Sequence, residues 1–152
     1  MILRDQTREH CYRDLISVDD LLRDLEPCLR NDLTLIGKHL RVLPDKVVFA
    51  VGGEPRNIYL HLSGQVALFQ DDDISKVVHV RPVGPNCIYG LVEALSGNAY
   101  GVSMKTLTAS EFDVIERDEL LSFIQNHPAL CFRLAEILSR LYQNALETIK
   151  SH

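Results

Sequence analysis

The stretch Asn86-Cys87-Ile88-Tyr89-Gly90-Leu91-Val92-Glu93-Ala94-Leu95-Ser96-Gly97, continuing through Asn98-Ala99-Tyr100-Gly101-Val102-Ser103, decides the fold of this chain. It is typical of a strand end, a glycine turn, one or two turns of helix, a second glycine loop and a new strand. A helix that begins directly after a glycine turn presents unpaired backbone N–H groups to an anion. The stretch therefore predicts a short helix inside a β-structure, and it raises the question of whether that helix holds a phosphate.

Length and charge bound the class of protein. The chain has 152 residues, a hydrophobic content of 46% and a net charge of −5, which predicts one ordinary globular domain. The acidic balance argues against a protein that coats DNA or an anionic membrane. No apolar run approaches the roughly 20 residues that span a bilayer, and the N-terminus is too charged for a signal peptide. We therefore expect a cytoplasmic location and no membrane partner.

The cysteines predict no metal centre. Cys11, Cys28, Cys87 and Cys131 are spread along the chain without a Cys-x-x-Cys pair. Zinc and iron–sulfur sites need ligands at short spacings. Reduced, buried thiols are the simpler interpretation.

The hydrophobic period divides the single domain (1–152) into three parts. Residues 1–38 read as helical: a helix over the first 16 residues, a second capped by Ser17-Val18-Asp19-Asp20, and a third that starts at Asn31-Asp32 and ends at Gly37. Residues 39–116 alternate with period two and predict a β-roll. Residues 117–152 predict a short helix and then a long one that opens at Pro128.

Within the β part, the strongest hairpin signal joins Ile58–Leu62 to Gln65–Phe69 through a Ser63-Gly64 turn. An acidic loop tip follows at 71–73. The remaining expected strands are 39–43, 46–50, 76–80, 102–107 and 111–115. Seven or eight short strands at this spacing favour a sandwich or jelly roll.

The last helix carries an apolar stripe that is candidate dimer surface. Its members recur at spacings of three and four, which suits packing on the roll, on a partner helix, or on both. They are Leu130 and the candidate dimer residues Leu134, Leu138, Leu141 and Ala145.

Taken together, these signals resemble a cyclic nucleotide-binding domain of the catabolite activator/FNR regulator kind over about residues 17–148. The ordered markers are Val51-Gly52-Gly53-Glu54, the hairpin with Gly64, Val83-Gly84-Pro85-Asn86, Ala109 to Ile115, and His127-Pro128. The resemblance implies an α+β fold: a β-roll (a double-stranded β-helix, or jelly roll, of about eight strands) with N-terminal helices and a long C-terminal helix. It also implies a non-enzymatic sensor or regulatory domain.

The phosphate cassette departs from the family pattern at two positions. Nucleotide binders read approximately F-G-E-x-A-L-L-x-G, and this chain has Leu91 where the glutamate would hold the ribose 2′-hydroxyl. Tyr100 stands where the family arginine would pair with the cyclic phosphate. Losing the arginine costs about 1.5–3 kcal/mol and losing the ribose acceptor roughly 1–3 kcal/mol more. Because this amounts to about two to four decades in affinity, ordinary cAMP or cGMP binding is disfavoured, and no cofactor is expected.

Several cassette residues remain candidates for a ligand site, with a structural interpretation beside each. Glu93 is either recruited by a register shift or is a solvated helix residue, and Lys105 either supplies charge to a phosphate or is a surface lysine. Tyr100 and Ser103 either orient a ligand or line a packed cavity. The full candidate set is Gly90, Leu91, Val92, Glu93, Tyr100, Gly101, Val102 and Ser103.

Other functional classes are less well supported. A cupin-like metalloenzyme would use His61 or His79, but the chain has no H-x-H pair. No serine or cysteine has a nucleophile motif, and a haem ligand has no local support. The chain shows no helix-turn-helix after the last helix, so we expect no operator binding by this chain alone. A functional pocket for a cyclic nucleotide or another small ligand, built on the cassette backbone, stays open as the alternative.

Overall fold

The computed structural model describes residues 16–23, 25–69, 77–81 and 87–150. The helix expected over the first 16 residues, the acidic loop at 71–73 and the turn at 82–86 lie outside these ranges, except for Ile16. No helix in the described part of the chain is long and apolar enough to cross a membrane.

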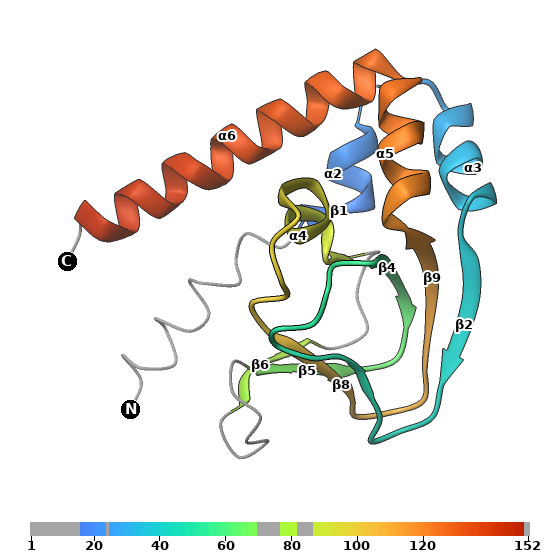
Figure 1. The fold of residues 1–152 in the computed structure, drawn as a ribbon, viewed down its shortest axis with the longest axis vertical. Coiled ribbons are helices and arrows are strands. Elements are labelled where there is room, and N and C mark those ends of the chain that lie inside the picture. The colour runs from blue at the N-terminus through green and yellow to red at the C-terminus, as the bar shows by residue number, and fades with distance from the viewer. Residues whose placement is uncertain (1–15, 24, 70–76, 82–86, 151–152) are drawn as a thin grey trace.

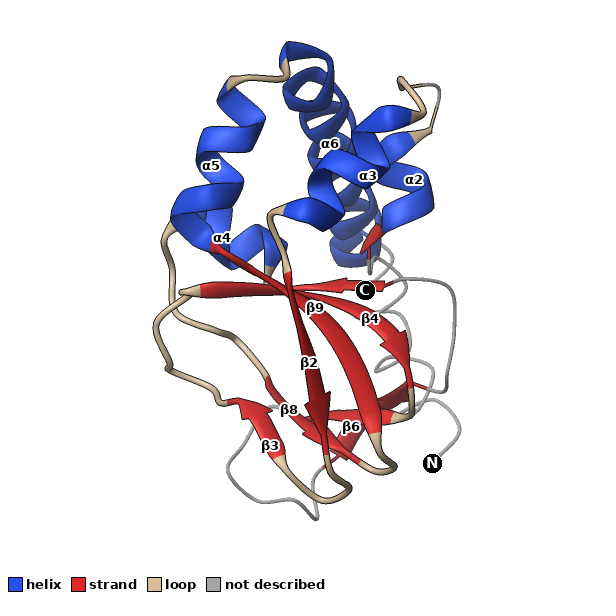
Figure 2. Ribbon diagram, turned by 90° about the vertical axis from the view of Figure 1, so that its right-hand side faces the viewer, coloured by secondary structure: helices blue, strands red, loops and turns tan. Residues whose placement is uncertain are grey.

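Helices gather on one side of a two-sheet β-roll, and the last helix runs out past it (Figure 1). Figure 2 shows the helical layer above the strands. The helices are α2 (Val18–Leu22), α3 (Cys28–Leu35), α4 (Leu91–Ser96), α5 (Arg117–Gln125) and α6 (Pro128–Lys150). The strands are β1 (Ile16–Ser17), β2 (Lys38–Val42), β3 (Val47–Phe49), β4 (Asn57–Ser63), β5 (Val66–Phe69), β6 (Val77–Arg81), β7 (Cys87–Tyr89), β8 (Ser103–Thr106) and β9 (Ser110–Glu116).

The described strands form two antiparallel sheets. One has the order β1-β7-β4-β9-β2 and the other the order β3-β8-β5-β6. Strands β2 to β9 make the expected roll, and α4 interrupts it between β7 and β8. The predicted α+β fold is therefore confirmed.

The predicted Ser63-Gly64 hairpin is wrong in its pairing. Strand β4 pairs with β7 and β9, whereas β5 pairs with β6 and β8, so the two strands belong to different sheets. Gly64 makes the corner between them with φ 92°. A Cβ there would lie 2.2 Å from the Ser110 hydroxyl and 2.5 Å from the Ala109 carbonyl oxygen. The glycine thus marks a close approach between the end of β4 and the start of β9, its neighbour in the same sheet. A glycine is equally typical of a tight turn.

The N-terminal helix boundaries are partly as predicted. Ser17 caps α2 by accepting a hydrogen bond from the Asp20 N–H at 3.0 Å. Helix α3, however, begins at Cys28 and not at Asn31, directly after Pro27 as its N-cap residue. Proline fits the start of a helix because its missing N–H would be unpaired there anyway, and this signal outweighs the asparagine cap.

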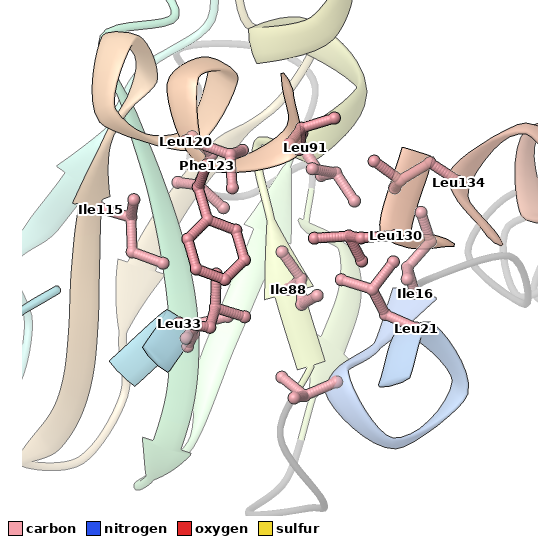
Figure 3. Packing of buried hydrophobic residues seen from close by; sticks show 14 of the residues in the cluster. Ile16, Leu21, Leu33, Ile88, Leu91, Ile115, Leu120, Phe123, Leu130 and Leu134 are labelled. Carbon is pink, nitrogen blue, oxygen red and sulfur yellow. The ribbon is translucent and has the colours of Figure 1, made fainter. Parts of the chain in front are cut away.

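Two hydrophobic cores follow from the alternation along the strands. Ile58 and Leu60 of β4 are buried in the cluster that includes residues of the helices. Figure 3 shows part of this helix-side core, in which Ile88 and Ile115 of the sheet meet Leu120, Phe123 and Leu130 of the helices. Tyr59 and His61, on the opposite face of β4, are buried inside the roll. The helix-side core collects leucine and isoleucine, while the roll interior is rich in aromatic rings.

Candidate functional site

The cassette helix α4 is bounded by two glycines in the left-handed region. Gly90 has φ 86° and Gly97 has φ 80°. The Gly90 carbonyl accepts the first helical hydrogen bond, from Ala94 N–H at 2.9 Å, and Gly97 N–H closes the end on the Glu93 carbonyl at 2.7 Å. No side chain caps the N-terminus. The geometry matches the glycine turn, short helix and second glycine predicted from the sequence.

Leu91 belongs to the core of the molecule. Its side chain is 3% exposed and belongs to the helix-side cluster, which also contains Leu134 of α6 (Figure 3). A side chain in that position is committed to holding α4 against the helices. Leu91 therefore fastens the cassette helix to the core.

Tyr100 lies inside the roll beside the start of the cassette. It is 6% exposed, and its hydroxyl donates a hydrogen bond to the Asn57 carbonyl at 2.7 Å. The Tyr100 hydroxyl oxygen in turn accepts a hydrogen bond from the Asn57 N–H at 3.4 Å. The ring stacks on Phe49 with 4.5 Å between centroids. These contacts fix both ends of the side chain.

The Tyr100 ring lies against the cassette glycines. A Cβ on Gly90 would lie 3.2 Å from Tyr100 Cε1 and 3.0 Å from the Asn57 carbonyl oxygen. A Cβ on Gly53 would lie 3.5 Å from the other edge of the ring and 3.1 Å from the Ala50 carbonyl. The backbone of Tyr100 also pairs with that loop, since its N–H donates to Gly53 and its carbonyl accepts from Gly52. The tyrosine thus fills the space between the glycine loop and the start of α4.

Tyr100 is uncharged at ordinary pH. Burial is the main cause that raises the pKa of its hydroxyl to about 12; the hydrogen bond at Asn57 opposes this shift, and the charges of Tyr59 and Glu93 add to it. The side chain can donate one neutral hydrogen bond, and the Asn57 carbonyl already receives it. It therefore offers no positive charge to a phosphate.

The remaining candidate ligand residues differ in their exposure and in their contacts. Glu93 is half-buried on α4 and electrostatically close to Tyr100, whereas Val92 and Gly101 are exposed and Val102 is half-buried. Ser103 is 2% exposed, and its hydroxyl accepts a hydrogen bond from Val51 N–H at 2.8 Å. The structure therefore brings Gly90, Glu93 and Tyr100 together and places Ser103 in a backbone contact.

Lys105 is engaged elsewhere. Its ammonium group lies 2.5 Å from the Asp45 carboxylate, and this contact holds the pKa of Asp45 below its ordinary value. The Lys105 side chain is 13% exposed. It tethers the turn between β2 and β3, which is neither of the two roles weighed from the sequence.

His61 is a structural residue. It is 1% exposed, and one ring nitrogen lies 3.0 Å from the Ser63 carbonyl oxygen while the other lies 3.3 Å from the Tyr89 hydroxyl. Among the described residues, no group of three or more His, Cys, Asp or Glu side chains could hold a metal ion.

Three residues near the cassette were not among the site residues predicted from the sequence. Phe49 provides the stacking surface for Tyr100, Asn57 accepts its hydroxyl, and Arg117 donates to the Ala94 carbonyl at 2.6 Å. Phe49 was expected only as part of a strand. Asn57 acts through its backbone, and Arg117 of α5 bonds a carbonyl of α4 that lies 23 residues away in the chain, so neither leaves a local motif.

Two antiparallel sheets rolled beside a short glycine-bounded helix, with helices along one side, are the architecture of cyclic nucleotide-binding regulatory domains. The chain belongs to that family, because the family model of the cyclic nucleotide-binding domain matches residues 39–127. A comparison with curated proteins finds no match.

Solved structures agree on the fold. The Thermus thermophilus catabolite activator protein superposes with a TM-score of 0.74 at 21% identity, over 86% of this chain and 62% of that one. The N-terminal domain of a Streptomyces coelicolor transcriptional regulator gives 0.73 at 15% identity, over 89% and 94%. CLP, a c-di-GMP-responsive global regulator from Xanthomonas campestris, gives 0.62 at 18% identity, over 82% and 62%. The chain thus spans about three-fifths of the length of the two full regulators.

Proposed function

We propose that this chain is a non-enzymatic regulatory domain of the cyclic nucleotide-binding family whose cassette does not take ordinary cAMP or cGMP. The observation that carries the proposal is the position of Tyr100. Its ring packs against Gly90 and Phe49, and its hydroxyl is bound to the Asn57 carbonyl. A cyclic phosphate at the start of α4 would meet this ring where the family has an arginine.

The energetic argument has two parts. A nucleotide would have to displace a buried tyrosine, which costs its hydrogen bond and its stacking contact, about 1–3 kcal/mol together. It would then find no guanidinium, which removes about 1.5–3 kcal/mol of charge-assisted binding. The two costs add to roughly two to four decades of affinity.

Leu91 supports the same proposal. Its side chain is in the core, so the cassette presents no carboxylate at that position to a ribose hydroxyl. The backbone N–H groups at the start of α4 keep their capacity for an anion. A ligand other than cAMP therefore stays compatible with the proposal, and one similar structure is that of a regulator described as responsive to c-di-GMP.

The non-enzymatic part of the proposal has independent support in the described residues. They contain no candidate metal cluster. The buried hydroxyls of Ser103 and Ser110 are engaged with the backbone at Val51 and Thr108. These observations argue against a cupin-type metal site in this part of the chain and against Ser103 or Ser110 as a nucleophile.

Calorimetric titration with cAMP, cGMP and c-di-GMP tests the proposal directly. We expect the wild-type protein to give no binding heat with cAMP or cGMP into the millimolar range. The Tyr100→Arg variant, checked for folding by its melting curve, restores a guanidinium beside Gly90 and is expected to gain measurable heat with cAMP. Micromolar binding of cAMP or cGMP by the wild-type protein would refute the proposal.

A further inference from the structure

The C-terminal end of α4 is held by a residue from another element. Arg117 is the first residue of α5, and its Nε donates to the Ala94 carbonyl at 2.6 Å. The last carbonyls of a helix lack partners within the helix, and a cation at that end also suits the helix dipole. A six-residue helix does not hold its shape alone in water, so this contact matters for α4.

The same arginine holds a second segment through its backbone. The Arg117 N–H donates to the Arg56 carbonyl at 2.8 Å. The next carbonyl along the chain, that of Asn57, accepts the Tyr100 hydroxyl at 2.7 Å. Two adjacent carbonyls at the start of β4 are therefore bound by different segments, that of Arg56 by α5 and that of Asn57 by Tyr100, which follows the cassette loop.

These contacts close a circuit around the cassette. Ala94 of α4 is bonded to the Arg117 side chain, and the Arg117 backbone is bonded to Arg56. Asn57, the next residue, is bonded to Tyr100, and the polypeptide between Tyr100 and α4 completes the ring of contacts. The circuit borders an open cleft of about 650 Å³ whose lining includes Arg56, Asn57, Gly97 and Arg117. Helix α5 in turn packs in the same core cluster as the start of α6, through Leu120, Phe123 and Leu130.

We infer that Arg117 and the Tyr100 hydroxyl act together as a clamp that couples the position of α4 to that of α5. Arg117 is a positioning residue in this device. A displacement of α4 breaks the bond to Ala94, loosens the Arg56–Asn57 segment and so reaches the first turn of α5. The inference concerns the folded chain without ligand and goes beyond the proposed lack of cAMP binding.

Amide hydrogen exchange followed by NMR tests the clamp. Arg117→Gln removes the bond to Ala94 and leaves the backbone bond to Arg56 intact. A charge-assisted hydrogen bond lost from a partly buried site corresponds to about a tenfold change in local opening. We therefore expect exchange to rise about tenfold in α4 and several-fold in α5. Tyr100→Phe, which removes only the hydroxyl, is expected to raise exchange in the same two helices.

The double variant Arg117→Gln/Tyr100→Phe distinguishes a clamp from two local contacts. For a clamp, its increase in exchange is smaller than the product of the two single increases, because either substitution already opens the circuit. Arg140→Gln, an exposed arginine on α6, is the control and should leave α4 and α5 unchanged. Arg117→Lys keeps the charge without the planar donor. If Arg117→Gln does not fold, the same exchange measurements are made with Arg117→Lys alone and combined with Tyr100→Phe.

Two results would overturn the inference. One is an increase confined to α4 in the arginine variants, which makes Arg117 a local helix cap. The other is a double variant whose effect equals the product of the single ones. Since no ligand is added, neither result depends on whether the cassette binds a nucleotide.

Discussion

At the scale of single residues, Tyr100 supports the cassette through packing and one neutral hydrogen bond. An arginine at this position would bring a permanent charge into the roll and would need an anion to compensate for its burial. The tyrosine is satisfied within the chain, by the Asn57 carbonyl and the Phe49 ring. The cassette backbone is therefore supported without any ligand.

The raised pKa of Tyr100 predicts a specific loss of stability in alkali. Its hydroxyl ionises near pH 10 in the unfolded chain and near pH 12 in the folded protein. The unfolded state therefore binds fewer protons than the native state above pH 10, and stability falls as pH rises through 10 to 12. Burial also raises the pKa of Tyr59, which adds to the same trend.

Urea unfolding at pH 8 and at pH 11 measures this effect. Tyr100→Phe should lose less stability between the two pH values than the wild-type protein does. Tyr142→Phe, at an exposed position, is the control and should follow the wild type. An unchanged pH slope in the Tyr100 variant would contradict the assignment.

Leu91 gives a second prediction at this scale. Leu91→Glu places a carboxylate in a core position that is 3% exposed. The cost is about 3 kcal/mol or more, because a buried charge without a partner is strongly unfavourable. Val92→Glu makes the same change one residue later at a site that is 45% exposed and should shift stability by about 0.5 kcal/mol or less. Similar melting temperatures for the two variants would contradict the placement of Leu91.

At the scale of elements, the corner between β4 and β5 is the most constrained turn described in the roll. Gly64→Ala combines a left-handed backbone with a Cβ 2.2 Å from the Ser110 hydroxyl and 2.5–2.6 Å from backbone atoms of Ala109 and Ser110. Because those atoms belong to β9 and the turn before it, and β9 pairs with β4 in the same sheet, relief requires the paired ends of β4 and β9 to move apart. We expect a loss of about 3 kcal/mol or more.

Gly52→Ala is the matched control for this prediction. Gly52 has a similar φ of 84°, but a Cβ there would meet nothing within 4 Å. Its cost should be the backbone strain alone, about 1–2 kcal/mol. Chemical denaturation of the two variants measures the cost of backbone strain alone at Gly52 and of strain plus a steric clash at Gly64. Equal losses of unfolding free energy would show that the corner at Gly64 is not crowded.

The strands beside this corner show which features could be predicted from the sequence and which could not. The period-two alternation expected over residues 39–116 holds along β4, where Ile58 and Leu60 belong to the helix-side core and Tyr59 to the roll interior, because successive side chains of a strand point to opposite faces. The sequence around Gly64 could not show which sheet β5 joins, since a glycine serves a hairpin turn and a sheet corner equally well. The cassette backbone was predictable from Gly90 and Gly97, whereas the contacts of Tyr100 depend on segments some 40 residues away.

At the scale of the whole molecule, α6 joins the core over only part of its length. Leu130, Leu134 and Ile137 are buried in the helix-side core, so Leu134, a candidate dimer residue, already packs within the chain. Leu138 and Leu141 are half-buried, and the Ala145 side chain lies outside the description. The helix continues to Lys150 and extends away from the roll (Figure 1). Among the described residues of α6, none beyond Leu141 belongs to the core.

We expect this outer part of α6 to pair with a second copy of the chain. Leu138, Leu141 and Tyr142 fall on one helical face, and two such helices would cover apolar surface that the monomer leaves accessible. Light scattering in solution should give the mass of a dimer for the wild-type protein. Leu138→Glu places two charges opposite each other at the contact and should shift the mass toward that of the monomer. Gln143→Glu adds the same charge at an exposed position on another face of the helix and should leave the mass unchanged. A wild-type monomer, or a Leu138→Glu variant that keeps the dimer mass, would show that α6 is not the contact.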